Sequence, residues 1–321
     1  MLALRVAGWG LAASLVMVAA GGACGQQYPN RPVRMVVSGT GGSSNFAARL
    51  IAPGLSASLG QQLVVDNRGS GAVAIEIVAR AAPDGYTLLM NGSNLWLLPF
   101  MRDRVPWDPI RDFAPLSLAI MAPNMLVVHP SLPVKSAREL IAHAAARPGV
   151  LNYATSGIGN SNHLAGVLFK AMAGVDMVQI NYKGAAIALS DLIAGQVQVM
   201  FPTPASVMAH VRSGRLKALA VTSAQPSPLL PGLPTVAATG LPGYESVSIF
   251  GAFAPAGTPP ALVARLNREI VGALSNPDVR KIFFNAGVEV VGSSPGEFSA
   301  MIKAEMSRMG KVIKDAGIRE E

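Results

Sequence analysis

Cysteine, aromatic side chains and charged groups are all scarce in this chain. Of its 321 residues, one is a cysteine, 6% are aromatic and 14% are charged. The four histidines form no His-Glu-x-x-His zinc motif, and no Gly-x-Ser-x-Gly nucleophile turn occurs. Clusters of acidic residues of the kind that hold Ca²⁺ or Mg²⁺ are also lacking. The sequence therefore predicts no metal and no cofactor, and it favours a protein that is not an enzyme.

The charge that is present is mostly positive. The formal net charge is +8, yet lysine and arginine are scattered, without long basic runs or interleaved aromatic residues. Nucleic-acid binding normally needs such a basic patch, so this class is disfavoured. A small anionic ligand fits the charge.

The N-terminal residues 1–25 differ from the rest. Arg5 precedes an apolar run over residues 11–20, and small residues follow up to Gly25. This order predicts a signal peptide cleaved near Gly25, which would place the protein in the periplasm. A lipid-modified Cys24 is the alternative. Later stretches are interrupted by charge, proline or glycine, so the mature chain is expected to be soluble.

Two passages of the chain repeat each other in order and chemistry. Each begins with a short apolar strand that ends in a Ser-Gly-x-Gly-x-Ser loop, starting at Ser38 and at Ser156. A helix follows, then a strand closed by a basic residue and glycine, at Arg68 and at Lys183. Alternating strands and helices predict an α/β protein with mostly parallel sheets and right-handed crossovers. Two such halves predict two lobes around one central cleft.

The two Gly/Ser loops are the candidate binding site. Each opens a helix, whose free N–H groups and positive dipole end suit a carboxylate. The alternative is that their serines and glycines serve only as helix caps and turns. We predict ligand contacts from the loops and from residues at neighbouring strand ends. These are Ser38, Gly39, Thr40, Gly41, Gly42, Ser43, Ser44, Asn45, Arg68, Ser93, Asn94, Thr155, Ser156, Gly157, Gly159, Asn160, Ser161, His163, Tyr182, Lys183 and Phe250.

Two residues near these loops have open alternatives. His163 either contacts the ligand or caps its helix. Trp96 follows the third strand of the first half, where it either lines the cleft or packs in the core.

A dinucleotide site is disfavoured, because Ser44 stands where the third glycine of Gly-x-Gly-x-x-Gly would be.

The C-terminal part is expected to return to the first lobe. A strand is predicted near residues 247–254, followed by two helices near 260–274 and 294–315. Lobe 1 would then comprise residues 26–125 and 249–321, and lobe 2 residues 126–248. Two chain crossings would form a hinge for closure around a ligand.

Several segments together resemble a known family. They include Tyr28–Val33, Ala82–Leu88, Val128–Val134, Tyr182–Gly184 and Ala254–Pro259. Taken in order, they span nearly the whole mature chain. The chain resembles the solute receptors of tripartite tricarboxylate transporters, the Bug family. The resemblance implies a type II-like periplasmic binding protein without catalysis, whose relatives bind di- and tricarboxylates, acidic amino acids or aromatic acids.

The sequence departs from the family pattern at four places near the expected cleft. Asn45 stands where the family commonly has Asp, and the segment 69–73 is about two residues shorter. Phe201-Pro202-Thr203 replaces Phe-Asp-Asn, and Ile249 replaces Trp. A less acidic pocket favours an anion, including a larger or more apolar acid.

The resemblance implies a monomeric receptor that delivers a small carboxylate to the membrane subunits of a secondary transporter. An alternative is an orphan binding protein that presents its ligand to a sensor or signalling partner. An exported hydrolase is disfavoured, because no nucleophile–base pair is recognisable.

Overall fold

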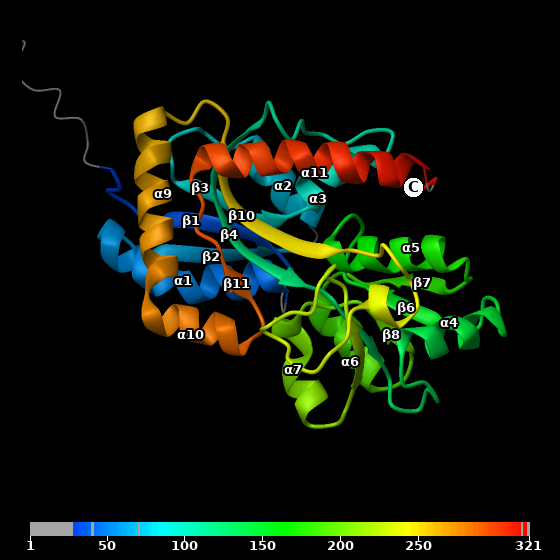
Figure 1. The fold of residues 1–321 in the computed structure, drawn as a ribbon. Helices are drawn as coiled ribbons and strands as arrows, with labels where there is room; N and C mark the ends of the chain where they lie inside the picture. Colours follow the sequence, from blue (N-terminus) through cyan, green and yellow to red (C-terminus); the bar gives the residue numbers. More distant parts are fainter. Residues whose placement is uncertain (1–27, 40–41, 70, 316, 320–321) are drawn as a thin grey trace, which may run out of the picture.

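Two β-sheets organise the protein in the computed structural model (Figure 1), which describes residues 28–39, 42–69, 71–315 and 317–319. The first sheet has the order β11-β4-β10-β3-β1-β2 and the second has the order β7-β6-β8-β5-β9. The strands of the first sheet are β1 (Val33–Ser38), β2 (Leu63–Arg68), β3 (Thr87–Gly92), β4 (Phe113–Pro123), β10 (Val247–Pro255) and β11 (Glu289–Val290). Those of the second are β5 (Met125–Val128), β6 (Asn152–Thr155), β7 (Val178–Asn181), β8 (Val199–Met200) and β9 (Lys217–Val221). The predicted signal peptide, Cys24, Thr40 and Gly41 lie outside the described residues.

Helices flank both sheets. Those of the first half and the C-terminal part are α1 (Ser43–Leu59), α2 (Gly71–Ala79), α3 (Asn94–Leu97), the 3₁₀ turn η1 (Leu98–Phe100), α9 (Pro260–Ser275), α10 (Pro277–Asn285) and α11 (Pro295–Asp315). Those of the middle of the chain are α4 (Ala137–Ala145), α5 (Ser161–Ala173), α6 (Ala185–Ile193), α7 (Pro204–Arg212) and α8 (Val236–Thr239). The two-lobed α/β class predicted from the sequence is thus confirmed.

The internal repeat reappears in the strand pairing. In the first sheet β1 lies between β2 and β3 and is parallel to both. In the second sheet β6 lies between β7 and β8, again parallel to both. Each half therefore brings the carboxyl ends of three parallel strands to one sheet edge, where open α/β sheets bind ligands.

The remaining pairings are antiparallel, so both sheets are mixed where mostly parallel sheets were expected. β10 pairs antiparallel with β3 and β4, and β5 pairs antiparallel with β8 and β9. The physical reason is the path of the chain. The chain leaves the first sheet after β4 and returns to it at β10, so these two strands run in opposite directions where they pair.

Apolar side chains between sheet and helices form the core. Trp96 is fully buried and packs edge-on against Phe298, with ring centroids 6.4 Å apart. Of its two predicted roles, the structure thus supports core packing. The helix α10 was among those not expected from the sequence. It directly follows α9, because Asn276 caps it by accepting from the backbone N–H groups of Asp278 and Val279.

A buried polar cluster joins the two connections between the sheets. Asn124 lies between β4 and β5, and its side-chain oxygen accepts a hydrogen bond from Ser248 of β10. The Asn124 amide donates to the carbonyl of Ser161, 2.9 Å away, at the start of α5. Ser248 also bonds the Ser161 hydroxyl, at 2.6 Å. Asn124 and Ser248 are fully buried. The crossing point of the chain is therefore tied directly to the helix that follows the second Gly/Ser loop.

Candidate functional site

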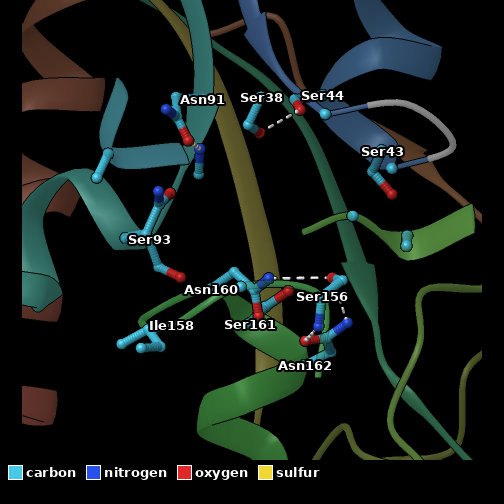
Figure 2. Close-up of a pocket in the computed structure, with 18 of the residues that line it drawn as sticks. Ser38, Ser43, Ser44, Asn91, Ser93, Ser156, Ile158, Asn160, Ser161 and Asn162 are labelled. Carbon is cyan, nitrogen blue, oxygen red and sulfur yellow. Dashed lines mark hydrogen bonds between the residues drawn. The ribbon is translucent and has the colours of Figure 1, made fainter. Parts of the chain in front are cut away.

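A cavity of about 350 Å³ lies between the two sheets and is lined from both halves of the chain. Its size is typical of sites for small molecules. Fourteen of the predicted site residues line it. They are Ser38, Gly39, Gly42, Ser43, Ser44, Ser93, Asn94, Ser156, Gly157, Asn160, Ser161, Tyr182, Lys183 and Phe250. The close-up in Figure 2 shows serine and asparagine side chains gathered around it from several loops.

Other predicted residues lie next to the cavity without lining it. Asn45 and Thr155 are buried. Gly159 lies against Leu98 and Asn94. His163 is fully buried, and its Nδ1 accepts from the backbone N–H of Gly159 at 3.2 Å. The N-cap of its helix is Asn160, which accepts from the His163 backbone N–H at 3.0 Å. His163 thus supports the shape of the loop.

Arg68 also lies outside the cavity. Its guanidinium donates two hydrogen bonds to Asp66, of 2.9 and 3.0 Å, on a largely exposed surface. The Asp66 carboxylate, on the same strand, holds it there. Arg68 and Lys183, which matched in sequence, therefore differ in their surroundings.

The first loop presents a helix end without a side-chain cap. Gly42 is the N-cap of α1 and has no side chain to accept from the first N–H groups of the helix. These groups need another acceptor, which an anion can supply. Ser43 and Ser44 are buried in the first turn, and the Ser44 hydroxyl lies 3.2 Å from that of Ser38.

The second loop is fixed by its own side chains. The Ser156 hydroxyl accepts from the amides of Asn160, at 3.0 Å, and Asn162, at 2.7 Å. Asn162 in turn accepts from the Ser156 backbone N–H at 3.2 Å. Figure 2 shows these bonds below the cavity. Such a loop is ordered before a ligand arrives, which lowers the entropy cost of binding.

The two lobes touch at two places beside the cavity. The Ser43 and Thr203 hydroxyl oxygens lie 2.7 Å apart and share a hydrogen bond, and Ser206 lies 3.1 Å from Thr203. At the second place, a Cβ at Gly159 would meet the Leu98 side chain at 3.1 Å. These contacts place the lobes in a closed arrangement around the cavity.

Sequence reasoning missed several lining residues. The following were not predicted: Gly69, Ala72, Asn91, Gly92, Leu98, Arg102, Ile158, Asn162, Asn181, Gly184, Ala185, Thr203 and Ser206. Asn91 and Thr203 had a usable signal, because Asn91 lies at the end of the third strand of its half and Thr203 lies shortly after the third strand of the other. Arg102 had none, since it lies in an irregular turn after η1. Ile249, a departure from the family pattern, packs in the core.

The charge of the cavity wall is positive. Arg102 and Lys183 are its charged residues, and the described lining includes no Asp or Glu. Tyr182 donates its hydroxyl proton to Asp191 at 2.7 Å. Burial, and then the Asp191 carboxylate, raise the pKa of Tyr182 to about 12, so it stays neutral at ordinary pH. The wall therefore offers hydrogen-bond donors and positive charge to an anion.

The part of the chain that the structure describes contains no candidate metal site and no helix that could span a membrane. His, Cys, Asp and Glu form no group of three suited to a metal ion there. Every helix among the same residues is too short or too polar to cross a lipid bilayer.

Comparison with known proteins decides the family. The model of the tripartite tricarboxylate transporter family receptor matches residues 47–318. The chain belongs to this family. It is a family of solute-binding receptors and not of enzymes.

Solved structures extend the likeness to the whole fold. The R. palustris protein Rpa4515 with adipate is 38% identical, with a TM-score of 0.87 over 91% of this chain and 99% of its own. The periplasmic binding protein BugD is 31% identical, with a TM-score of 0.88 over 92% and 100%. MatC from Rhodopseudomonas palustris with bound malate is 30% identical, with a TM-score of 0.84 over 89% and 100%. Both named ligands are carboxylates.

Proposed function

We propose that this receptor binds a small carboxylate in the cavity between its lobes and delivers it to the membrane subunits of a tripartite tricarboxylate-type transporter. The observation that carries the proposal is the wall of the cavity. The lining includes the N-terminal ends of two long helices, α1 and α5, and two cationic residues. The described lining has no acidic residue. Helix N-termini and cations stabilise a carboxylate together. The adipate and malate of two solved relatives support the same class of ligand.

We infer that one carboxylate of the ligand lies at the two loops. The uncapped first turn of α1, beginning at Gly42, supplies backbone N–H groups from one lobe. From the other lobe, Ser156 supplies its hydroxyl group, which the Asn160 and Asn162 side chains hold in place. A ligand bridging both loops favours the closed arrangement, because it contacts both walls only when the lobes meet.

We further propose that the receptor works in the periplasm and that its two lobes move against each other. Cleavage of the signal peptide near Gly25 would release a soluble periplasmic monomer. Lobe 1, residues 26–125 and 249–321, would rotate against lobe 2, residues 126–248, about the crossing at Asn124 and Ser248. The open form would admit the ligand, and the closed form would be the one that the membrane subunits recognise.

The binding step is tested by thermal shift against a panel of carboxylates, with protein unfolded and refolded to remove bound ligand. A ligand at about one hundred times its dissociation constant stabilises the folded state by about 2.7 kcal/mol, which raises the melting temperature by several degrees. A shift with at least one carboxylate is expected and is followed by calorimetry. A folded, ligand-free protein that responds to no carboxylate would refute the proposal.

Delivery is tested separately in cells that carry the membrane subunits. Deletion of the gene for this receptor should abolish uptake of the labelled acid identified by calorimetry, and re-expression should restore it. Unchanged uptake after deletion would remove the transport role and leave the binding role standing.

A further inference from the structure

We propose that Asn91, Ser93 and Arg102 form a second carboxylate subsite, which makes this receptor selective for α,ω-dicarboxylates over monocarboxylates. The inference rests on the proposed function, because it assumes that the first carboxylate lies at the two Gly/Ser loops. It adds residues outside those loops and a specific class of ligand.

Asn91 offers a buried donor that the protein itself leaves unused. The side chain is 1% exposed at the end of β3 and lines the cavity. Its oxygen accepts from the backbone N–H of Gly92 at 2.7 Å, which assigns the amide orientation. The NH₂ group is buried and has no hydrogen-bond partner among the described residues. A buried donor without an acceptor costs stability, so an acceptor on a ligand explains its presence.

Ser93 repeats this pattern two residues later. It is 5% exposed, lines the same wall, and its hydroxyl is buried without a partner among the described residues. Figure 2 shows Asn91 and Ser93 on one side of the cavity, across from Ser43 and Ser44 of the first loop. Two neighbouring donors thus point to an acceptor that is distinct from the one at the loops.

Arg102 supplies positive charge to the lining of the same cavity. It follows η1, and its backbone N–H donates to the carbonyl of Leu98 at 3.1 Å, which anchors it beside that lining residue. A guanidinium binds a carboxylate through two parallel hydrogen bonds. Asn91 and Ser93, close by in sequence, add hydrogen-bond donors, and the described lining has no acidic residue that would repel an anion. The cavity wall therefore fits a carboxylate.

The space between the two subsites is partly apolar. Leu98, Ile158 and Phe250 contribute to the lining alongside the polar groups. A chain of methylene groups fits against such side chains, while its two ends meet donors on opposite walls. A monocarboxylate of equal length would leave the buried donors of the second subsite unpaired. Sites built in this way reject ligands that lack the matching polar group.

The experiment compares matched pairs of ligands by calorimetry. The dicarboxylates from succinate to suberate are each paired with the monocarboxylate of the same carbon number, such as adipate with hexanoate. The unaltered receptor should bind at least one dicarboxylate more than 100-fold more tightly than its partner. Arg102→Met should lower that affinity at least 10-fold and leave the monocarboxylate within about two-fold. Ser93→Ala should act in the same direction with a smaller effect.

Arg104→Met is the matched control. It removes a positive charge two residues away, from an exposed side chain that does not line the cavity. Both affinities should stay unchanged, which separates a local contact from a general effect of charge. Melting temperatures of all variants establish that they are folded.

The outcomes distinguish this inference from the proposed function. Equal affinity for the paired acids, or an equal loss of both in Arg102→Met, would overturn the second subsite while carboxylate binding stands. Absence of binding by every mono- and dicarboxylate, with folded ligand-free protein, would overturn both.

Discussion

The Ser43 and Thr203 hydroxyl oxygens lie 2.7 Å apart, although 160 positions separate the two residues in the chain. Ser43 opens α1 in the first half, and Thr203 is the N-cap of α7 in the second. The hydrogen bond joins the lobes at the wall of the cavity, so it contributes to the closed form and is absent when the lobes separate.

Removing this bond should weaken ligand binding more than folding. Ser43→Ala deletes a hydrogen bond worth about 1 kcal/mol, which corresponds to about a five-fold loss of affinity if closure and binding are coupled. The melting temperature of the ligand-free protein should change by less than about 2 °C. Calorimetry and thermal unfolding measure the two effects. Ser190→Ala, which removes an exposed hydroxyl bond within α6, is the control and should leave affinity unchanged. Equal affinity in both variants would contradict the coupling.

Gly159 should be required for closure. Its φ of +75° lies in the left-handed region, and a Cβ there would meet Leu98 of the other lobe at 3.1 Å. Gly159→Ala should lower the free energy of unfolding by about 1–2 kcal/mol and reduce affinity at least 10-fold.

The control for this substitution is Gly174→Ala. Gly174 has a similar φ of +62° at the end of α5, but a Cβ there would meet no atom within 4 Å. It should show the same loss of stability in urea with unchanged affinity. A similar affinity loss in both variants would mean that backbone strain, and not contact between lobes, is responsible.

Ligand affinity should be nearly independent of pH between 6 and 9. The described lining includes no carboxyl or imidazole group, and the pKa of Tyr182 is raised to about 12 by burial and by Asp191. Below about pH 5 affinity should fall, because the ligand's own carboxylates become protonated. Calorimetry across this range tests the expectation. A midpoint between pH 6 and 9 would contradict the expectation.

Tyr182 should also limit stability at high pH. In the unfolded chain a tyrosine ionises near pH 10, whereas in the folded protein its pKa is about 12. Between these values the unfolded state loses its proton first, so stability is complete below pH 10 and declines as pH rises toward 12. Tyr182→Phe should remove this part of the decline in urea unfolding experiments. An identical alkaline profile in the variant would argue against the assignment.

The buried crossing should be a strong determinant of stability. Asn124→Ala removes bonds to Ser161 and Ser248 and leaves buried polar groups unpaired, at a cost of about 2–3 kcal/mol. Urea unfolding measures this loss. Asn276→Ala, which removes an exposed helix cap, should cost about 1 kcal/mol and provides the comparison. A cost for Asn124→Ala no larger than that of the cap would show that solvent replaces the lost bonds.

The sequence predicted those parts of the fold and site that local signals encode. The loops at Ser38 and Ser156 were found because glycine and serine between a strand and a helix identify a helix N-terminus in the chain itself. The repeat then implied that both face one cleft. The short helix α10 was missed, because its start at Pro277 follows α9 without a separating loop.

What the sequence could not predict depends on tertiary contacts. Arg102 lines the cavity only because η1 packs beside it, and no periodic pattern precedes that residue. Thr203 gains its role from a partner in the other half of the chain. Arg68 was predicted to lie in the cleft, because the repeat matched it to Lys183. In the structure its guanidinium instead binds Asp66 on the same strand, outside the cavity.

The contact between Asn124 and Ser248 has a consequence for how the chain folds. The segment between them, more than a hundred residues long, begins and ends at the same point in space. Such a segment behaves as an insertion whose ends are already joined, and the entropy of closing so long a loop grows only slowly with its length. The lobe built from it can therefore gain or lose residues, or acquire new surface loops, without altering the strand order of the lobe that carries it.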